Sequence, residues 1–186
     1  MADFSANSIC YARESAARQK LDICYLQQNY LELQEENRYD LIMMIFTDFG
    51  VLLPVERQKL LNNVLRALKP GGRFLFDVMN KNFPATGAGT KGWEAVEKGF
   101  WRGEPYLVLT ESMFYKEQQV TLSQHVVIDA NEAVEIYRFW IHTFSHADLQ
   151  GLLASHNFRV TKCYDRLIPG CDMYRSEDVT FCIAFK

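Results

Sequence analysis

The chain has 186 residues, 48% of them hydrophobic, which suits one sizeable buried core and is too small for two ordinary domains. Its 20 lysines and arginines against 23 aspartates and glutamates give a formal net charge of −3, so no positive field is available to hold nucleic acid. No apolar run is long enough to cross a bilayer, and the first residues lack the apolar block of a secretory signal. We therefore expect a cytoplasmic protein without a membrane or nucleic-acid partner.

The cysteines and histidines predict no metal site. The five cysteines are an odd number without closely spaced pairs, which favours free, mostly buried thiols. His142 and His146 are four residues apart, a spacing that could share one helical face, but Ser145 between them is typical of a helix N-cap. We expect the two histidines to flank the junction of a strand and a helix.

The first part of the chain predicts a helix followed by two strands. Ser5 can cap a helix that runs to about Lys20. Residues 22–29 are short and apolar enough for a strand, and residues 39–46 form a nearly continuous apolar run. Such a run is typical of a strand buried on both faces, so we expect residues 39–46 at the centre of a sheet.

A helix and a further strand follow this central strand. Pro54 suits the first turn of a helix, and residues 69–72 (Lys-Pro-Gly-Gly) end it. The apolar stripe between them consists of Leu61, Val64, Leu65 and Leu68. Residues 74–78 return as a buried strand, and the order strand, helix, strand predicts a right-handed crossover in a parallel sheet.

The second half predicts a loop and an antiparallel meander. Residues 80–105 contain five glycines between aromatic side chains, which indicates a mobile loop. Three β-patterned stretches come next, residues 106–115, 120–129 and 134–142. They predict an antiparallel meander added to the parallel sheet.

The chain closes with a helix and two strands. Ser145 and Asp148 form a capping-box pair at the start of the helix, and Asn157 is a natural left-handed stop. Residues 158–164 and 179–185 have the pattern of two final strands.

Three stretches carry a resemblance to a known family. They are residues 39–42 (Tyr-Asp-Leu-Ile), 47–52 (Thr-Asp-Phe-Gly-Val-Leu) and 68–77 (Leu-Lys-Pro-Gly-Gly-Arg-Phe-Leu-Phe-Asp). Together with the order of the elements, they resemble class I, Rossmann-type S-adenosylmethionine-dependent methyltransferases from the second strand of that family onward. The opening residues 3–9 are similar to the segment that ends that second strand.

The resemblance implies S-adenosylmethionine as cofactor and a set of residues that bind it. In the family, the acidic residue that ends the second strand accepts hydrogen bonds from the ribose hydroxyls; Asp3 occupies that place, and Phe4 would lie against the adenine. Asn29 would bind the adenine amino group, and Tyr30 or Leu31 would cover its ring. The residues that would line the methyl-transfer site are Thr47, Asp48 and Phe49.

Each of these residues also has a plain structural interpretation. Asp3 can be the acid that precedes a helix N-cap, and Asn29 can be a turn residue. Asp48 can be a loop acid, and Phe49 can be an ordinary core residue.

The sequence departs from the family in one respect. The family places a first strand and a Gly-x-Gly-x-Gly-like turn ahead of the position that Asp3 occupies. Residues 87–92 have a Gly-x-Gly-x-x-Gly spacing, but they lie behind Pro84 without a following helix, and we interpret them as a loop. Without a neighbour, residues 39–46 would present an unpaired apolar edge. We expect this edge to be covered by the 22–29 strand or by a second copy in a homodimer.

The predicted fold is therefore an α/β, truncated Rossmann-like methyltransferase sheet with an inserted antiparallel three-stranded meander. Residues 1–186 form one domain, in which residues 80–144 supply the loop and the insertion over the acceptor site. The resemblance implies methyl transfer to a small molecule by direct attack on the sulfonium methyl. No catalytic residue is assigned, and the acceptor-binding candidates are Tyr115, His125, Arg138 and Trp140. The alternative is a non-catalytic, methyltransferase-like remnant that binds a partner or dimerises.

Overall fold

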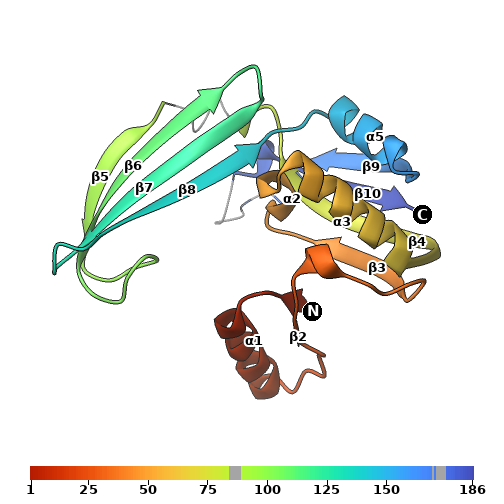
Figure 1. Ribbon diagram of the computed structural model, residues 1–186, viewed down its shortest axis with the longest axis horizontal. Helices are drawn as coiled ribbons and strands as arrows, with labels where there is room; N and C mark the ends of the chain where they lie inside the picture. Colours follow the sequence, from red (N-terminus) through yellow and green to blue (C-terminus); the bar gives the residue numbers. More distant parts are fainter. Residues whose placement is uncertain (84–88, 169, 171–174) are drawn as a thin grey trace.

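The computed structural model describes residues 1–83, 89–168, 170 and 175–186, and its strands form three sheets (Figure 1). A two-stranded parallel sheet joins β1 (Ala2–Asp3) to β2 (Leu26–Gln27). The second sheet has the order β3 (Tyr39–Met44), β4 (Leu68–Met79), β10 (Val179–Phe185) and β9 (Arg159–Asp165). The third has the order β5 (Lys91–Val96), β6 (Tyr106–Tyr115), β7 (Val120–Asp129) and β8 (Val134–His142). The helices are α1 (Ala6–Arg18), α2 (Asp48–Val51), α3 (Pro54–Ala67) and α5 (His146–Ser155), with 3-10 turns η1 (Tyr30–Glu32) and η2 (Ser176–Asp178).

The main core lies between the β3-β4-β10-β9 sheet and helices α3 and α5. Strand β3 runs parallel to β4, as the strand–helix–strand pattern predicted, while β10 is antiparallel to both β4 and β9. The alternate residues Phe74, Phe76 and Val78 of β4 are fully buried in one cluster with apolar side chains of α3 and α5. The α/β class is thereby confirmed.

The helix ends follow the local signals in the sequence. The side chain of Ser5 accepts a hydrogen bond from the Ser8 amide at 3.2 Å, and α1 begins at the next residue. At α3, Pro54 takes the first position and Glu56 accepts from the Leu53 amide at 2.8 Å. The capping box predicted at Ser145 is present and starts α5.

The antiparallel sheet contains the three predicted strands with the predicted bounds. A turn at residues 129–133 joins β7 to β8, and the side chain of Asp129 accepts from the amides of Asn131 at 2.8 Å and Ala133 at 3.0 Å. The loop prediction for residues 80–105 was wrong in part, because residues 91–96 form β5 and pair antiparallel with β6. Gly92 of the glycine-spaced segment lies in this strand, and Gly87 lies outside the described residues.

Strand β3 is not the centre of a sheet, contrary to the prediction. It is the first strand of its sheet, and within residues 1–83, 89–168 and 175–186 no strand pairs with its outer edge. The expected pairing of residues 22–29 with this edge was also wrong. The amides of Leu26 and Gln28 donate to the carbonyl oxygens of Met1 and Asp3, each at 2.9 Å, so β2 pairs with β1.

The expectation of mostly buried thiols was also wrong. Among the cysteines in the described part of the chain, Cys10 and Cys24 are exposed, Cys163 is half-buried and Cys182 is buried. The short helix α1 and its small two-stranded sheet bury too little surface to cover the first two. No helix of the described residues is both long and apolar enough to cross a membrane.

Candidate functional site

The ends of β1, β2 and β3 bring the residues predicted to bind the cofactor towards one place. Asp3 ends β1, Tyr30 begins η1 after β2, and Asp48 begins α2 after β3. The pKa of the Tyr30 hydroxyl is raised, first by burial and then by the negative charges of Asp48, Glu56 and Asp3. Three separate segments of the chain therefore lie close enough for their charges to interact.

The connection from β3 to α2 is strained and is held by a buried carboxylate. Phe46 and Thr47 have φ angles of 82° and 59°, in the left-handed region that residues other than glycine rarely adopt. The amide of Thr47 donates to Oδ1 of Asp77 at 2.9 Å, and Asp77 on β4 is fully buried. Because such strain persists only where surrounding structure enforces it, Asp77 fixes the position of the residues that follow.

Asp48 adds a further negative charge beside Asp77 and Asp3, near the carboxyl end of β3. Its pKa is raised, first because neighbouring atoms displace water from the carboxylate and then because of the charges of Asp77 and Asp3. Like charges that crowd one site are relieved when a cation binds. The arrangement therefore favours a positively charged ligand.

The side chains of Asp3 and Asn29 each accept a hydrogen bond from a backbone amide two residues further along the chain. Oδ1 of Asp3 accepts from the Ser5 amide at 2.8 Å, which is the structural role weighed for it, while Asp3 remains half-buried. Oδ1 of Asn29 accepts from the Leu31 amide at 2.9 Å and caps η1. A carboxylate has further lone pairs, so the bond to Ser5 leaves Asp3 able to accept from a ligand.

The two aromatic candidates beside these residues differ in exposure. Phe4 is 73% exposed next to Asp3, where a ligand ring can reach it. Phe49 is fully buried and packs on Phe76 and Phe144 with ring centroids 4.7 and 5.9 Å apart. The structure therefore places Phe49 in the core and not on the surface of the site.

The acceptor candidates are divided between the two faces of the antiparallel sheet. Arg138 and Trp140 alternate along β8 on one face, and the ring centroid of Tyr115 lies 5.8 Å from that of Trp140. His125 lies opposite Tyr137 and so belongs to the other face. The prediction grouped four residues, and the structure brings three of them to one face.

On its own face, His125 belongs to an aromatic cluster. Its ring centroid lies 5.0 Å from that of Trp101, and Nδ1 lies 3.2 Å from the hydroxyl of Thr110. Burial lowers the pKa of the imidazole. These contacts match the packing role of a strand histidine.

His142 contacts α2 at this end of the sheet and was not among the residues predicted from the sequence. It ends β8 on the face that carries Trp140, and its Nδ1 lies 3.0 Å from the carbonyl oxygen of Gly50 in α2. The pKa of His142 is lowered by burial and by the positive charge of Arg57. The only sequence signal was its spacing from His146, which instead pairs with Asp165 at 3.1 Å.

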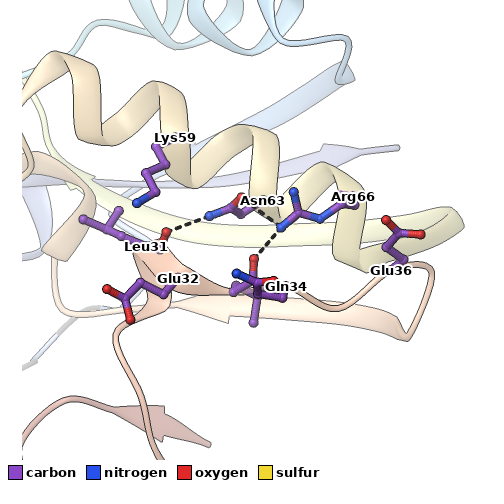
Figure 2. Close-up of a pocket in the computed structure, with 8 residues that line it drawn as sticks. Leu31, Glu32, Gln34, Glu36, Lys59, Asn63 and Arg66 are labelled. Atoms are coloured by element: carbon purple, nitrogen blue, oxygen red, sulfur yellow. Dashed lines mark hydrogen bonds between the residues drawn. The ribbon is translucent and has the colours of Figure 1, made fainter.

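A cavity of about 330 Å³ lies elsewhere, between α3 and a segment made of the end of η1 and the residues that follow it (Figure 2). The side chains of Asn63 and Arg66 reach across to this segment, and Nδ2 of Asn63 donates to the Leu31 carbonyl at 2.9 Å. Acidic and basic side chains line it in equal number: Glu32, Glu36, Lys59 and Arg66. Of the residues predicted to bind the cofactor, Leu31, the alternative to Tyr30, is the one that lines this cavity.

Comparison with known proteins agrees with the motifs and the fold. A family described as "Methyltransferase domain" matches residues 1–72. The tRNA N(3)-methylcytidine methyltransferase Mettl2 of Drosophila melanogaster is 27% identical over 125 residues, which are 59% of this chain. The chain spans 36% of the length of that relative.

Solved methyltransferase structures share the fold along nearly the whole chain. An S-adenosylmethionine-dependent methyltransferase from Clostridium acetobutylicum superposes with a TM-score of 0.72 at 14% identity, over 99% of this chain and 73% of that one. The CcbJ methyltransferase from Streptomyces caelestis gives a TM-score of 0.65 at 18% identity, over 98% and 72%. The structure of CalS10, an amino pentose methyltransferase from Micromonospora echinaspora with S-adenosylmethionine bound, gives 0.59 at 15% identity, over 99% and 72%.

Sequence motifs, matched family and fold agree with one another. Residues 1–72 match a methyltransferase domain family, and the chain as a whole has the fold of S-adenosylmethionine-dependent methyltransferase structures, as the resemblance to class I, Rossmann-type methyltransferases predicted.

Proposed function

We propose that the protein is an S-adenosylmethionine-dependent methyltransferase. The observation that carries the proposal is the convergence of Asp3, Tyr30 and Asp48 at the ends of three strands. In folds of this type, ligands bind where parallel strands end. The cofactor carries a sulfonium and an ammonium group, and the negative charge of Asp48, Asp77 and Asp3 suits such a cation. When bound, it supplies an electrophilic methyl group.

Each residue has a role that its position permits. Asp3 would accept hydrogen bonds from the ribose hydroxyls, with the exposed ring of Phe4 against the adenine. Asn29 and Tyr30 would border the adenine edge. Thr47 and Asp48 would face the methionine end, because they lie in the strained turn that Asp77 holds.

Isothermal titration with S-adenosylmethionine and S-adenosylhomocysteine tests cofactor binding. The most informative variant is Asp3→Asn, because its side-chain oxygen can still accept from the Ser5 amide while the negative charge is lost. Asp22→Asn removes an exposed charge outside the proposed site and serves as the matched control. We expect micromolar binding for the wild type and the control, and a loss of at least tenfold for Asp3→Asn. No heat change for the wild type at millimolar ligand would refute the proposal.

The proposed acceptor is a small molecule. Tyr115 and Trp140 form an aromatic pair on the face of the antiparallel sheet that reaches α2, and such surfaces bind compact, partly apolar ligands. The net charge of −3 and the acidic strand ends disfavour a polyanion. A tRNA acceptor is the second candidate, since the matched Drosophila relative is named for methylating tRNA.

Methyl-labelled S-adenosylmethionine separates the two acceptor classes. The protein is incubated with an ultrafiltered small-molecule extract and, separately, with bulk tRNA, and incorporated label is counted. Label in the extract supports the small-molecule acceptor, whereas label in tRNA alone overturns it. Cofactor binding without label in either supports the non-catalytic alternative, which the methyltransferase names of the matched proteins do not favour.

The proposal also covers the domain organisation, the oligomeric state and the cellular location of the protein. Residues 1–186 act as one methyltransferase-like unit, in which residues 80–144 cover the acceptor side. A homodimer covers the outer edge and the solvent face of β3, where Leu41 and Met43 are 49% and 55% exposed. The proposed location is the cytoplasm.

A further inference from the structure

One contact joins the antiparallel sheet to the end of β3. His142, the last residue of β8, lies 3.0 Å through Nδ1 from the carbonyl oxygen of Gly50. The packing around this contact is close, since a Cβ atom on Gly50 would lie 3.1 Å from the backbone oxygen of His142. Gly50 follows Asp48 and Phe49 in α2, so His142 is fixed beside the segment proposed to face the methionine end of the cofactor.

The contact determines which ring nitrogen of His142 carries the proton. A carbonyl oxygen can only accept, so Nδ1 must donate to it. In the neutral imidazole, Nε2 then has a free lone pair and can accept a proton. The described residues offer Nε2 no hydrogen-bond partner.

The surroundings of His142 keep the imidazole neutral. Burial and the charge of Arg57 on α3 lower its pKa from the ordinary 6.5, and the bond to Gly50 opposes this only in part. The other charged groups on elements packed at this end of β8 are Asp48 on α2 and the pair formed by Lys81 and Asp148 at 3.2 Å. Lys81 also donates to the carbonyl of neighbouring Thr143 at 3.0 Å.

His142 lies on the same face of the antiparallel sheet as the aromatic pair Tyr115 and Trp140. Val120 of β7 pairs with both Tyr115 and His142, so these two residues share one face with Trp140. The face runs from the aromatic pair to α2. An acceptor held by Tyr115 and Trp140 would therefore have His142 between itself and the carboxyl end of β3.

We infer that His142 is the general base of the methyl transfer, taking the proton of the acceptor nucleophile at Nε2. This inference rests on the proposed function. The acceptor's nitrogen or oxygen bonds to the methyl carbon, and the bond from that carbon to the cofactor sulfur breaks with its electron pair left on sulfur. The acceptor's proton passes to Nε2, giving an imidazolium that returns it to water.

The variants separate the chemical role from the structural one. In His142→Asn, the side-chain amide can replace Nδ1–H as donor to Gly50, but no base remains. His142→Ala removes both functions. His156→Asn is the matched control, because Nδ1 of half-buried His156 also lies 2.9 Å from a backbone carbonyl, that of Leu152, at the far end of α5.

The rate of label transfer from methyl-labelled S-adenosylmethionine to the small-molecule extract is measured across pH for each variant, with cofactor affinity measured by titration. For His142→Asn we expect unchanged affinity, a rate lower by about 10²–10⁴-fold and loss of the decline in rate on the acid side. A wild-type rate and pH profile in His142→Asn would overturn the inference while leaving the proposed function intact. Lack of cofactor binding by the wild type would instead refute the proposed function.

Long-range ¹H–¹⁵N NMR of the cofactor-free protein provides a readout that needs no acceptor. Protonated Nδ1 and unprotonated Nε2 at neutral pH are expected for His142. A proton on Nε2 at that pH would overturn the assignment whatever the enzyme's activity.

Discussion

The antiparallel sheet and the β3 edge show how differently two regions of one chain depend on distant residues. In β6, β7 and β8, each strand pairs with its neighbour in sequence through a short turn. Strand β3 pairs with β4 across helix α3, and its outer edge has no partner in the described chain. A hairpin sets its own register, whereas the neighbours of a parallel strand lie far away in sequence.

The two regions also differ in how they bury apolar side chains. The sheet of β3 and β4 shares a large core with α3 and α5, while the antiparallel sheet has a small cluster around Tyr106, Val108 and Val127. Local pairing can therefore hold the second region with little core. The first region depends on packing between distant segments.

Truncation of Phe76 should cause the largest loss of folding stability. Its ring lies 4.7 Å from both Phe49 and Phe74 and is fully buried, so Phe76→Ala should lower the free energy of unfolding by about 3–5 kcal/mol. Val127→Ala in the smaller cluster should cost about 2 kcal/mol. Urea unfolding measures both, and an equal loss at the two positions would contradict the contrast drawn between the regions.

A charge on β3 should break the proposed assembly. Met43→Lys places an ammonium on a half-exposed apolar surface, and loss of one buried side chain per copy would weaken association by roughly 1.5–3 kcal/mol. Sedimentation velocity should show a wild-type dimer and a monomeric variant. Val55→Lys is the matched control on α3, where Val55 is 66% exposed. A monomeric wild type across the concentration range would show that no second copy covers the edge.

Loss of the cap of α5, which was predicted from the sequence, should lower the free energy of unfolding by a smaller amount. In Ser145→Ala, the Asp148 amide loses the acceptor it now has at 3.1 Å, which should cost about 0.5–2 kcal/mol. Gln150→Ala, at an exposed position of the same helix, should change stability by less than about 0.5 kcal/mol. Thermal unfolding compares the pair, and equal midpoints would mean that the cap contributes nothing.

The smallest effect should come from Asp48→Asn and should depend on pH. The pKa of Asp48 in the folded protein is above its ordinary value of 3.8. The raised pKa therefore adds to the free energy of unfolding in full below pH 3.8, and this addition is lost as pH rises through the pKa of the folded state. At neutral pH the variant should be more stable by less than about 1 kcal/mol, since the side chain is partly exposed. The gain should vanish at acid pH while cofactor binding weakens at neutral pH.

Unfolding midpoints at the two pH values, with Asp22→Asn as control, measure this effect. A gain that is the same at both pH values would show that charge repulsion at Asp48 is not its cause.

Much of the fold could be predicted because its signals are local. The caps at Ser5 and Ser145, the proline at the start of α3 and the alternation along β6, β7 and β8 act over a few residues. The family resemblance also pointed to the strand ends near which Asp3, Asn29 and Asp48 lie. These features need no knowledge of which segments meet in space.

The sequence by itself determined the type of most elements, the bounds of β6, β7 and β8, and the resemblance of the chain to a family. Tertiary structure alone decided that β3 lies at a sheet edge, that Asp77 holds the strained turn at Thr47, and that His142 meets Gly50. The two hydrogen bonds, Thr47 to Asp77 and His142 to Gly50, join residues 30 and 92 positions apart along the chain. Apolar residues in β3 look the same whether a strand, a helix or a second copy covers them, because burial is set by the partner and not by the residue.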